Sequence, residues 1–255
     1  MHRNCKLYGQ YSTMILKNTY IIFLFLLFNS LTAKEINPQW AIYWSGSGKR
    51  IVADKSNQKL LGGAAITALA VTQIDMKVKN YIQSNKVLSA PVSHIGDKYG
   101  GTWGHWILWS SILATSKINN DSQEELFSKL QFSSLAMVTN GIITYGMKIG
   151  FGRERPNGSC CKSFPSGHTS HSFTIAAIAH ELYGNQIGSI AYGLATLVAV
   201  SRINDNKHYL SDVIFGTALG TVVGRSFAIQ YNENNNNIVV IGITPQLHLR
   251  ITFPL

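Results

Sequence analysis

Apolar residues between residues 57 and 229 recur with the helical period of about 3.6 residues rather than with the alternation of a β-strand. Ser, Thr, Asn, Gly or a charged residue interrupts each apolar segment, so none reaches the run of about 18 residues typical of a membrane-spanning helix. The pattern predicts an all-α bundle and favours a soluble one, although stretches rich in small residues fit close helix packing in either setting. The expected helices cover residues 57–72, 74–84, 103–116, 122–150, 167–183, 186–202 and 208–229.

The best-marked helix start lies at residues 121–124, where the sequence Asp-Ser-Gln-Glu has the pattern of a capping box. The same residues place acidic groups at the positive end of the helix dipole. Residues 34–55, by contrast, show no helical period and are expected to form an irregular segment.

The C-terminal segment differs from the rest of the chain. Residues 232–237 are almost all Asn and predict a polar turn, while residues 247–253 alternate apolar and polar side chains as a strand does. Together with the apolar residues 238–243, they predict a small β-hairpin within residues 231–255, added to a domain of residues 34–230.

Residues 1–33 have the pattern of a targeting segment. Lys17 precedes an apolar run over residues 20–28, and small residues lead to Ala33, as in a signal peptide. The run is shorter than the roughly 20 residues that span a bilayer, so cleavage after Ala33 is favoured over an uncleaved anchor. Met14 begins a conventional signal sequence and is an alternative start. We expect an exported protein, located in the periplasm or envelope.

Charge indicates the kind of partner. The 22 Lys and Arg residues outnumber the 12 Asp and Glu residues, giving a formal net charge of +10. A basic surface concentrates anions, so phosphorylated substrates and anionic membrane surfaces are expected partners. No basic run interleaved with aromatic residues is present, so nucleic acid is not expected. Oligomeric state is open.

The cysteines do not form a disulfide framework. Cys5 lies in the targeting segment, which leaves the adjacent pair Cys160 and Cys161. A disulfide between neighbours is strained, so two ordinary loop thiols are the favoured interpretation.

Three basic residues could surround a phosphoryl group, whose equatorial oxygens need positive charge during transfer. Arg155 and Arg202 offer planar forks that bind two oxygens, and Lys148 offers a compact charge. No acidic cluster or His/Cys ligand spacing lies nearby, so these cations are expected to replace a metal ion, and no metal site is predicted.

Two further segments supply anion binding and proton transfer. Ser166 and Gly167 precede a predicted helix, where N–H groups and the serine hydroxyl can bind an anion, and His168 follows as a candidate general acid. His208 and Asp212 are four residues apart, which predicts one face of a helix, with the carboxylate orienting the imidazole for nucleophilic attack. Any of these residues alone would more often be structural, but their joint spacing favours catalysis.

Together these segments resemble the type 2 phosphatidic acid phosphatase (PAP2) superfamily. Its signature is Lys-x6-Arg-Pro, then Pro-Ser-Gly-His, then Ser-Arg-x5-His-x3-Asp, and every specified position matches within residues 148–212. The resemblance implies a roughly six-helix bundle of the acid phosphatase and vanadium haloperoxidase type, with the active site at one end of the core helices.

The resemblance also implies the reaction. His208 would attack phosphorus to form a phosphohistidine, while His168 would protonate the departing alkoxide and later accept a proton from water. Phosphomonoesters are the implied substrates, with lipid phosphates and isoprenyl pyrophosphates as typical cases. No cofactor is implied, and vanadate is expected to inhibit as a phosphate mimic.

Three alternatives stay open: a vanadate-dependent haloperoxidase, a lipid phosphotransferase, and a non-catalytic envelope protein of the same fold. Loops at 85–102 and 157–164 are expected to select the substrate. Other polar residues are assigned no chemistry, because they lack a partner at diagnostic spacing or suit a local ion pair; these are His94, Asp97, His105, Arg153, Glu154, His171 and His180.

Overall fold

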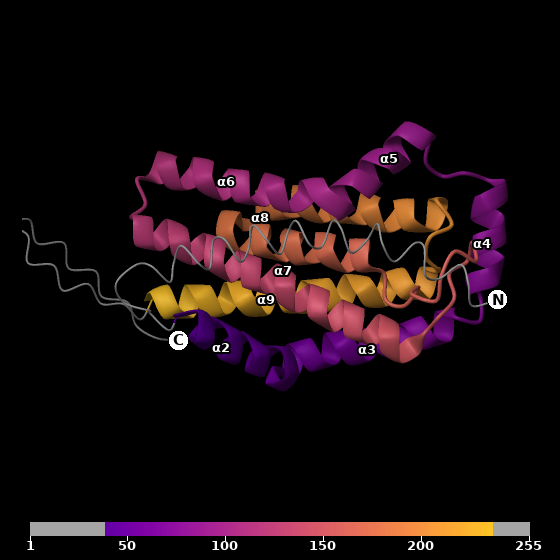
Figure 1. Ribbon diagram of the computed structural model, residues 1–255, viewed down its shortest axis with the longest axis horizontal. Coiled ribbons are helices and arrows are strands. Elements are labelled where there is room, and N and C mark those ends of the chain that lie inside the picture. Colours follow the sequence, from indigo (N-terminus) through magenta and orange to yellow (C-terminus); the bar gives the residue numbers. More distant parts are fainter. Residues whose placement is uncertain (1–38, 237–255) are drawn as a thin grey trace, which may run out of the picture.

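A computed structural model describes residues 39–236, which form a bundle of helices (Figure 1). The all-α prediction is confirmed for this part of the chain. In chain order the elements are α2 (Gln39–Ala53), α3 (Lys55–Val71), α4 (Asp75–Ser84), α5 (Ala90–Lys98), the π-helical turn η1 (Tyr99–Trp103), α6 (Gly104–Asn119), α7 (Gln123–Phe151), α8 (Gly167–Asn204) and α9 (Leu210–Asn236).

Helix α9 lies at the centre of the bundle and packs against α2, α3, α7 and α8. Figure 1 shows α5 and α6 along one side, α2 and α3 along the opposite side, and α4 across one end. The α7–α8 and α8–α9 connections meet at the end marked by α4. Polar loop residues from distant parts of the sequence are thereby gathered at one end of an apolar core.

Helix α8 is a hairpin of two arms rather than one straight rod. Gly184 has φ 78° and ψ −173°, a conformation that glycine adopts readily because it has no Cβ. Close packing of the arms follows, since a Cβ at Gly188 would approach the Cβ of His180 to 2.7 Å. The predicted break between residues 167–183 and 186–202 is confirmed, and the second arm returns to the end where the first begins.

Small residues allow the first arm of α8 to lie close to α9. Gly216, Gly220 and Gly224 are spaced four apart on α9, and a Cβ at any of them would crowd the backbone of α8. At Gly220 it would overlap the carbonyl oxygen of Ser170, and at Gly224 that of Thr174. This close approach fixes the distance between the two helix starts that carry Ser166 and Asp212.

Several sequence predictions are wrong at the edges of the bundle. Residues 39–53 form α2 instead of an irregular segment, because Tyr43 is fully buried and its ring lies 6.4 Å from that of Tyr231. Residues within 85–102 form α5 and η1 rather than a loop. The predicted polar turn is helical through Asn236, so the boundary at 230/231 does not end the bundle. The expected hairpin, like the targeting segment, lies outside the described residues.

The start of α7 is shifted by one residue from its prediction. Ser122 is the cap, and its Oγ accepts a hydrogen bond from the Glu125 N–H at 3.1 Å. Asp121 instead pairs with Lys129. The helix ends at Gly152, which has the left-handed φ of 55° common at helix C-termini.

The Gly220 contact gives the first prediction. Gly220→Ala should lower the free energy of unfolding by about 1–3 kcal/mol, because the added methyl forces α8 and α9 apart. The matched control is Gly193→Ala in the exposed face of α8, where nothing lies within 4 Å of the new Cβ. It should stabilise the helix by up to about 1 kcal/mol. Thermal unfolding of both variants measures the contrast, and equal effects would contradict the packing.

Candidate active site

The predicted site residues come together at the end of the bundle near α4. Lys148 lies in the last turn of α7, and its Nζ donates to the carbonyl oxygen of Pro165 at 2.6 Å. The Ser166 N–H donates to the backbone carbonyl of Asp212 at 3.0 Å, and the His208 N–H to that of Arg202 at 3.2 Å. Segments up to 64 residues apart in sequence, from 148 to 212, thus form one cluster.

His208 and Asp212 are adjacent, but not through the geometry expected from their spacing. His208 lies in the turn before α9, and its Nδ1 is 3.6 Å from Asp212 Oδ2, beyond hydrogen-bond range. Asp212 Oδ2 instead accepts from the Tyr209 N–H at 2.8 Å, capping the first turn of α9. The prediction of one helix face is therefore wrong, because α9 begins at Leu210 and His208 lies before it.

Burial controls the protonation of His208. The side chain is 3% exposed, and burial lowers the pKa to about 4, with Lys148 and Arg155 adding to the shift and Asp212 opposing it. The ring is therefore neutral near pH 7. A neutral imidazole with Nδ1 beside a carboxylate leaves Nε2 as the nitrogen available for attack.

Lys148 and Arg155 supply positive charge beside His208. Lys148 Nζ also donates to the carbonyl of Lys162 at 2.8 Å, and burial, followed by the charge of Arg155, lowers its pKa to about 7. The Arg155 Nε is buried without a hydrogen-bond partner among the described residues. A buried guanidinium N–H without a partner is costly, and an anion in this cluster would satisfy it.

The N-terminus of α8 adds uncharged donors. Ser166 is the fully buried N-cap residue, but its hydroxyl pairs with Thr169 Oγ1 at 2.9 Å instead of capping the helix. The first N–H groups of α8, from Gly167 and His168, are therefore open to an anion at the positive end of the helix.

Arg202 and His168 are joined by Asp97, a residue that sequence reasoning set aside. Asp97 Oδ1 accepts from Arg202 Nη1 and lies 3.4 Å from His168 Nε2. Burial raises the pKa of Asp97, and the charges of Arg202 and His168 outweigh it, so the pKa lies below its usual value. No spacing in the sequence signals this contact, since Asp97 on α5 is more than 70 residues from either partner.

Arg153 also differs from its expected local pairing with Glu154. Its Nη1 donates to Asp212 Oδ1 and its Nη2 to Asp75 Oδ2, both at 2.7 Å. Asp75, on α4, is 2% exposed and also accepts from the Ser211 N–H at 3.1 Å. Arg153 thus holds the carboxylate next to His208 between two elements of the bundle.

The remaining polar residues do not belong to the cluster of predicted site residues near α4. His171 packs its ring 5.7 Å from His105, in agreement with a structural role. Cys160 and Cys161 are not joined in a disulfide. Among residues 39–236, no group of three or more His, Cys, Asp or Glu side chains is arranged to hold a metal ion.

Comparison with known proteins shows similarity over part of the chain. Residues 132–236 match the sequence profile of the PAP2 superfamily. A lipid A 1-phosphatase from Porphyromonas gingivalis is 40% identical over a match covering 36% of this chain and 21% of that protein. Lipid phosphate phosphatase 1 from Arabidopsis thaliana is 30% identical, covering 39% of this chain and 43% of that protein. The chain thus spans less than half the length of either curated relative.

Of two similar solved structures, one shares the fold. The transmembrane PAP2-type phosphatidylglycerolphosphate phosphatase from Bacillus subtilis aligns with a TM-score of 0.54 at 18% identity, covering 72% of this chain and 97% of that one. Aquifex aeolicus LpxE aligns with a TM-score of 0.47 at 21% identity, covering 59% and 92%. The profile match and the motifs make residues 132–236 similar to the PAP2 superfamily.

The ion pairs of Arg153 with Asp75 and Asp212 give the second prediction. Arg153→Ala should lower the free energy of unfolding by about 3–5 kcal/mol, because it leaves the buried Asp75 and Asp212 carboxylates unpaired. Arg225→Ala is the matched control, since Arg225 is 49% exposed and 3.9 Å from Glu181. That change should cost less than about 1 kcal/mol. Similar thermal midpoints for the two variants would show that these ion pairs do not stabilise the fold.

Proposed function

We propose that this protein is a phosphatase that removes phosphate from a phosphorylated lipid through a phosphohistidine on His208, without a metal ion. The supporting observation is the placement of a neutral, carboxylate-paired imidazole next to Lys148 and Arg155, with Arg202 and the start of α8 at the same end. The names of both curated relatives, a lipid A phosphatase and a lipid phosphate phosphatase, favour a lipid substrate.

In the first step, the Nε2 lone pair of His208 attacks phosphorus while the bond from phosphorus to the substrate oxygen breaks. Asp212 holds the Nδ1 proton and stabilises the positive charge that develops on the ring. The 3.6 Å separation shortens as that charge forms, since catalytic hydrogen bonds tighten toward the transition state. Lys148, Arg155 and Arg202 neutralise the equatorial oxygens.

The leaving oxygen takes a proton from the protonated form of His168, which lies beside the Asp97 carboxylate that Arg202 also contacts. Burial, followed by the charge of Arg202, lowers the pKa of His168 to about 3, so His168 takes up this proton together with the anionic substrate. In the second step, water attacks the phosphohistidine while His168 accepts its proton, the N–P bond breaks and inorganic phosphate leaves. Each histidine returns to its starting protonation state. Vanadate, which resembles the five-coordinate phosphorus of both steps, should therefore inhibit competitively.

The surface of the bundle supports membrane association, in contrast to the soluble bundle favoured by hydropathy. Large apolar side chains at least 63% exposed occur on several helices. Contiguous exposed apolar surface marks membrane or partner contacts. Within the described residues, Leu210–Asn234 of α9 is long and apolar enough to cross a membrane. Helix α8 is also long and apolar enough by length and composition, but it is folded back at Gly184. The most exposed large apolar residues on α3, α6, α7 and α8 are Ile66, Leu69, Ile118, Ile149, Phe151 and Ile190.

We further propose that the protein is exported and acts at the envelope. The support is the signal-like pattern of residues 1–33 together with the membrane-directed surface.

The reaction gives the third prediction. The full chain in detergent should release phosphate from phosphatidic acid in the presence of a chelator, and His208→Ala should lower kcat by at least about 1,000-fold. His94→Ala, on the exposed face of α5, is the control and should retain activity. Protein quenched in alkali or in sodium dodecyl sulfate should carry alkali-stable, acid-labile phosphate, as a phosphohistidine does. Activity lost on chelation, or unchanged in His208→Ala, would refute the mechanism.

Lys148 gives the fourth prediction, on pH. Its charged form binds phosphate, and its pKa is lowered to about 7, so kcat/KM should fall as pH rises through about 7. Lys148→Arg keeps the positive charge at all accessible pH values and should lose this fall, whatever its absolute rate. Ionisation of the substrate affects kcat/KM of the wild type and of Lys148→Arg equally, so it cancels when one pH profile is divided by the other. A profile of the same shape in both proteins would contradict the assignment.

A further inference from the structure

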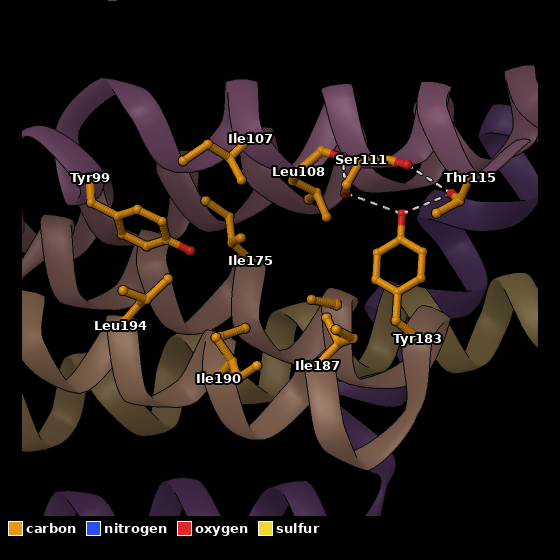
Figure 2. Close-up of a pocket in the computed structure, with 12 residues that line it drawn as sticks. Tyr99, Ile107, Leu108, Ser111, Thr115, Ile175, Tyr183, Ile187, Ile190 and Leu194 are labelled. Carbon is orange, nitrogen blue, oxygen red and sulfur yellow. Dashed lines mark hydrogen bonds between the residues drawn. The ribbon is translucent and has the colours of Figure 1, made fainter. Parts of the chain in front are cut away.

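An apolar cavity of about 470 Å³ lies between α6 and the two arms of α8 (Figure 2). Ile107 on α6, Ile175 and Ala179 on the first arm, and Leu194 on the second arm line its walls. The volume lies within the usual range for sites that bind small organic molecules. The catalytic steps proposed above do not use this cavity.

The cavity begins near the candidate active site. Tyr99 lines its near end, and the next two residues, Gly100 and Gly101, pack against His168. A Cβ at Gly101 would lie 3.1 Å from His168 Nε2, so the absence of a side chain keeps the space beside the imidazole open. Along the first arm of α8, Ile175 follows His168 by about 10 Å, so the cavity begins close to the reacting groups.

The far end of the cavity is closed by Tyr183, about 22 Å along the helix axis from His168. Figure 2 shows its ring crossing from α8 toward α6, with its hydroxyl between Ser111 and Thr115. The hydroxyl oxygen lies 3.2 Å from Ser111 Oγ and 3.4 Å from Thr115 Oγ1. These three hydroxyl groups satisfy one another's hydrogen bonds, and together they form the polar end of the apolar cavity.

One side of the cavity is open along the surface. Ile107, Ile187 and Ile190 line it and are 53%, 48% and 63% exposed. Exposed apolar side chains thus border the open side, so a hydrocarbon chain could enter the cavity from a lipid layer past these residues. The active-site end is cationic, whereas the cavity is apolar, which matches an amphiphile with an anionic head and a hydrocarbon chain.

We infer that this cavity binds one hydrocarbon chain of the phosphorylated lipid, and that Tyr183 limits the length of chain that is bound. The inference rests on the proposed function for the position of the phosphate. Each methylene that moves from water into an apolar site contributes about fourfold to binding. Catalytic efficiency should therefore rise with chain length until the chain reaches Tyr183, and then level off.

The test uses n-alkyl phosphates of increasing length, assayed with the full chain in mixed micelles of one fixed composition. For the wild type, kcat/KM should rise with length to a plateau. Ala179→Phe, which fills the cavity, should reduce kcat/KM for the longest substrate by more than about tenfold and leave the shortest within about twofold. Tyr183→Ala should move the plateau to longer chains, whereas Tyr183→Phe, which keeps the ring, should not.

Two further measurements keep the outcome decisive. Leu194→Trp fills the cavity from its partly exposed rim and replaces Ala179→Phe if that variant does not fold. Binding of non-hydrolysable n-alkyl phosphonates, followed by calorimetry, reports on the cavity without catalysis. Chain-dependent binding without phosphate release would refute the proposed function and support the cavity. Phosphate release with equal losses for short and long substrates in the filled variants would refute the cavity as a chain site.

Discussion

The buried carboxylate of Asp212 is the interaction on which the rest of the site depends. It is fully buried, and it accepts hydrogen bonds from Ser163 Oγ, the Tyr209 N–H and Arg153 Nη1. These donors come from the α7–α8 loop and the α8–α9 turn, so one carboxylate joins both connections to the start of α9. A buried charge held by several donors stays ionised. It lies 3.6 Å from His208 Nδ1, and through Ser163 it holds the loop that carries Arg155.

The basic residues at this end of the bundle fall into two groups, according to whether a carboxylate pairs with them. Arg153 and Arg202 are paired with carboxylates, so they stabilise the fold and keep their geometry without a ligand. Lys148 and Arg155 are not paired with a carboxylate in any ion pair of the described residues; one contacts carbonyl oxygens and the other has a buried N–H without a partner. A bound anion would therefore interact most favourably with Lys148 and Arg155. The site can thus be held rigid by its ion pairs and still have two cationic groups available for an anion.

Close helix packing connects this chemistry to the cavity. The reversal at Gly184 returns Arg202 to the level of His168 and leaves the apolar space between α6 and the two arms of α8. The glycines on α9 hold the first arm on the other side, so its position is set against α9 rather than by filling that space. A cationic site and an apolar channel beside it thus follow from one folded-back helix.

The local sequence determined most of the helices and the chemical character of the site. Periodicity located the two arms of α8, and the motif spacing identified the eight residues that meet near α4, because both signals depend on neighbours a few residues apart. Tertiary structure alone decided the partners of Asp97, Arg153 and Asp75, which come from elements far apart in the chain. It also decided α2, whose Ser and Gly residues weaken the helical pattern but whose buried Tyr43 and Ser47 pack within the bundle. Such long-range contacts produce no regular spacing in the sequence, because they depend on where the ends of the packed helices meet in space.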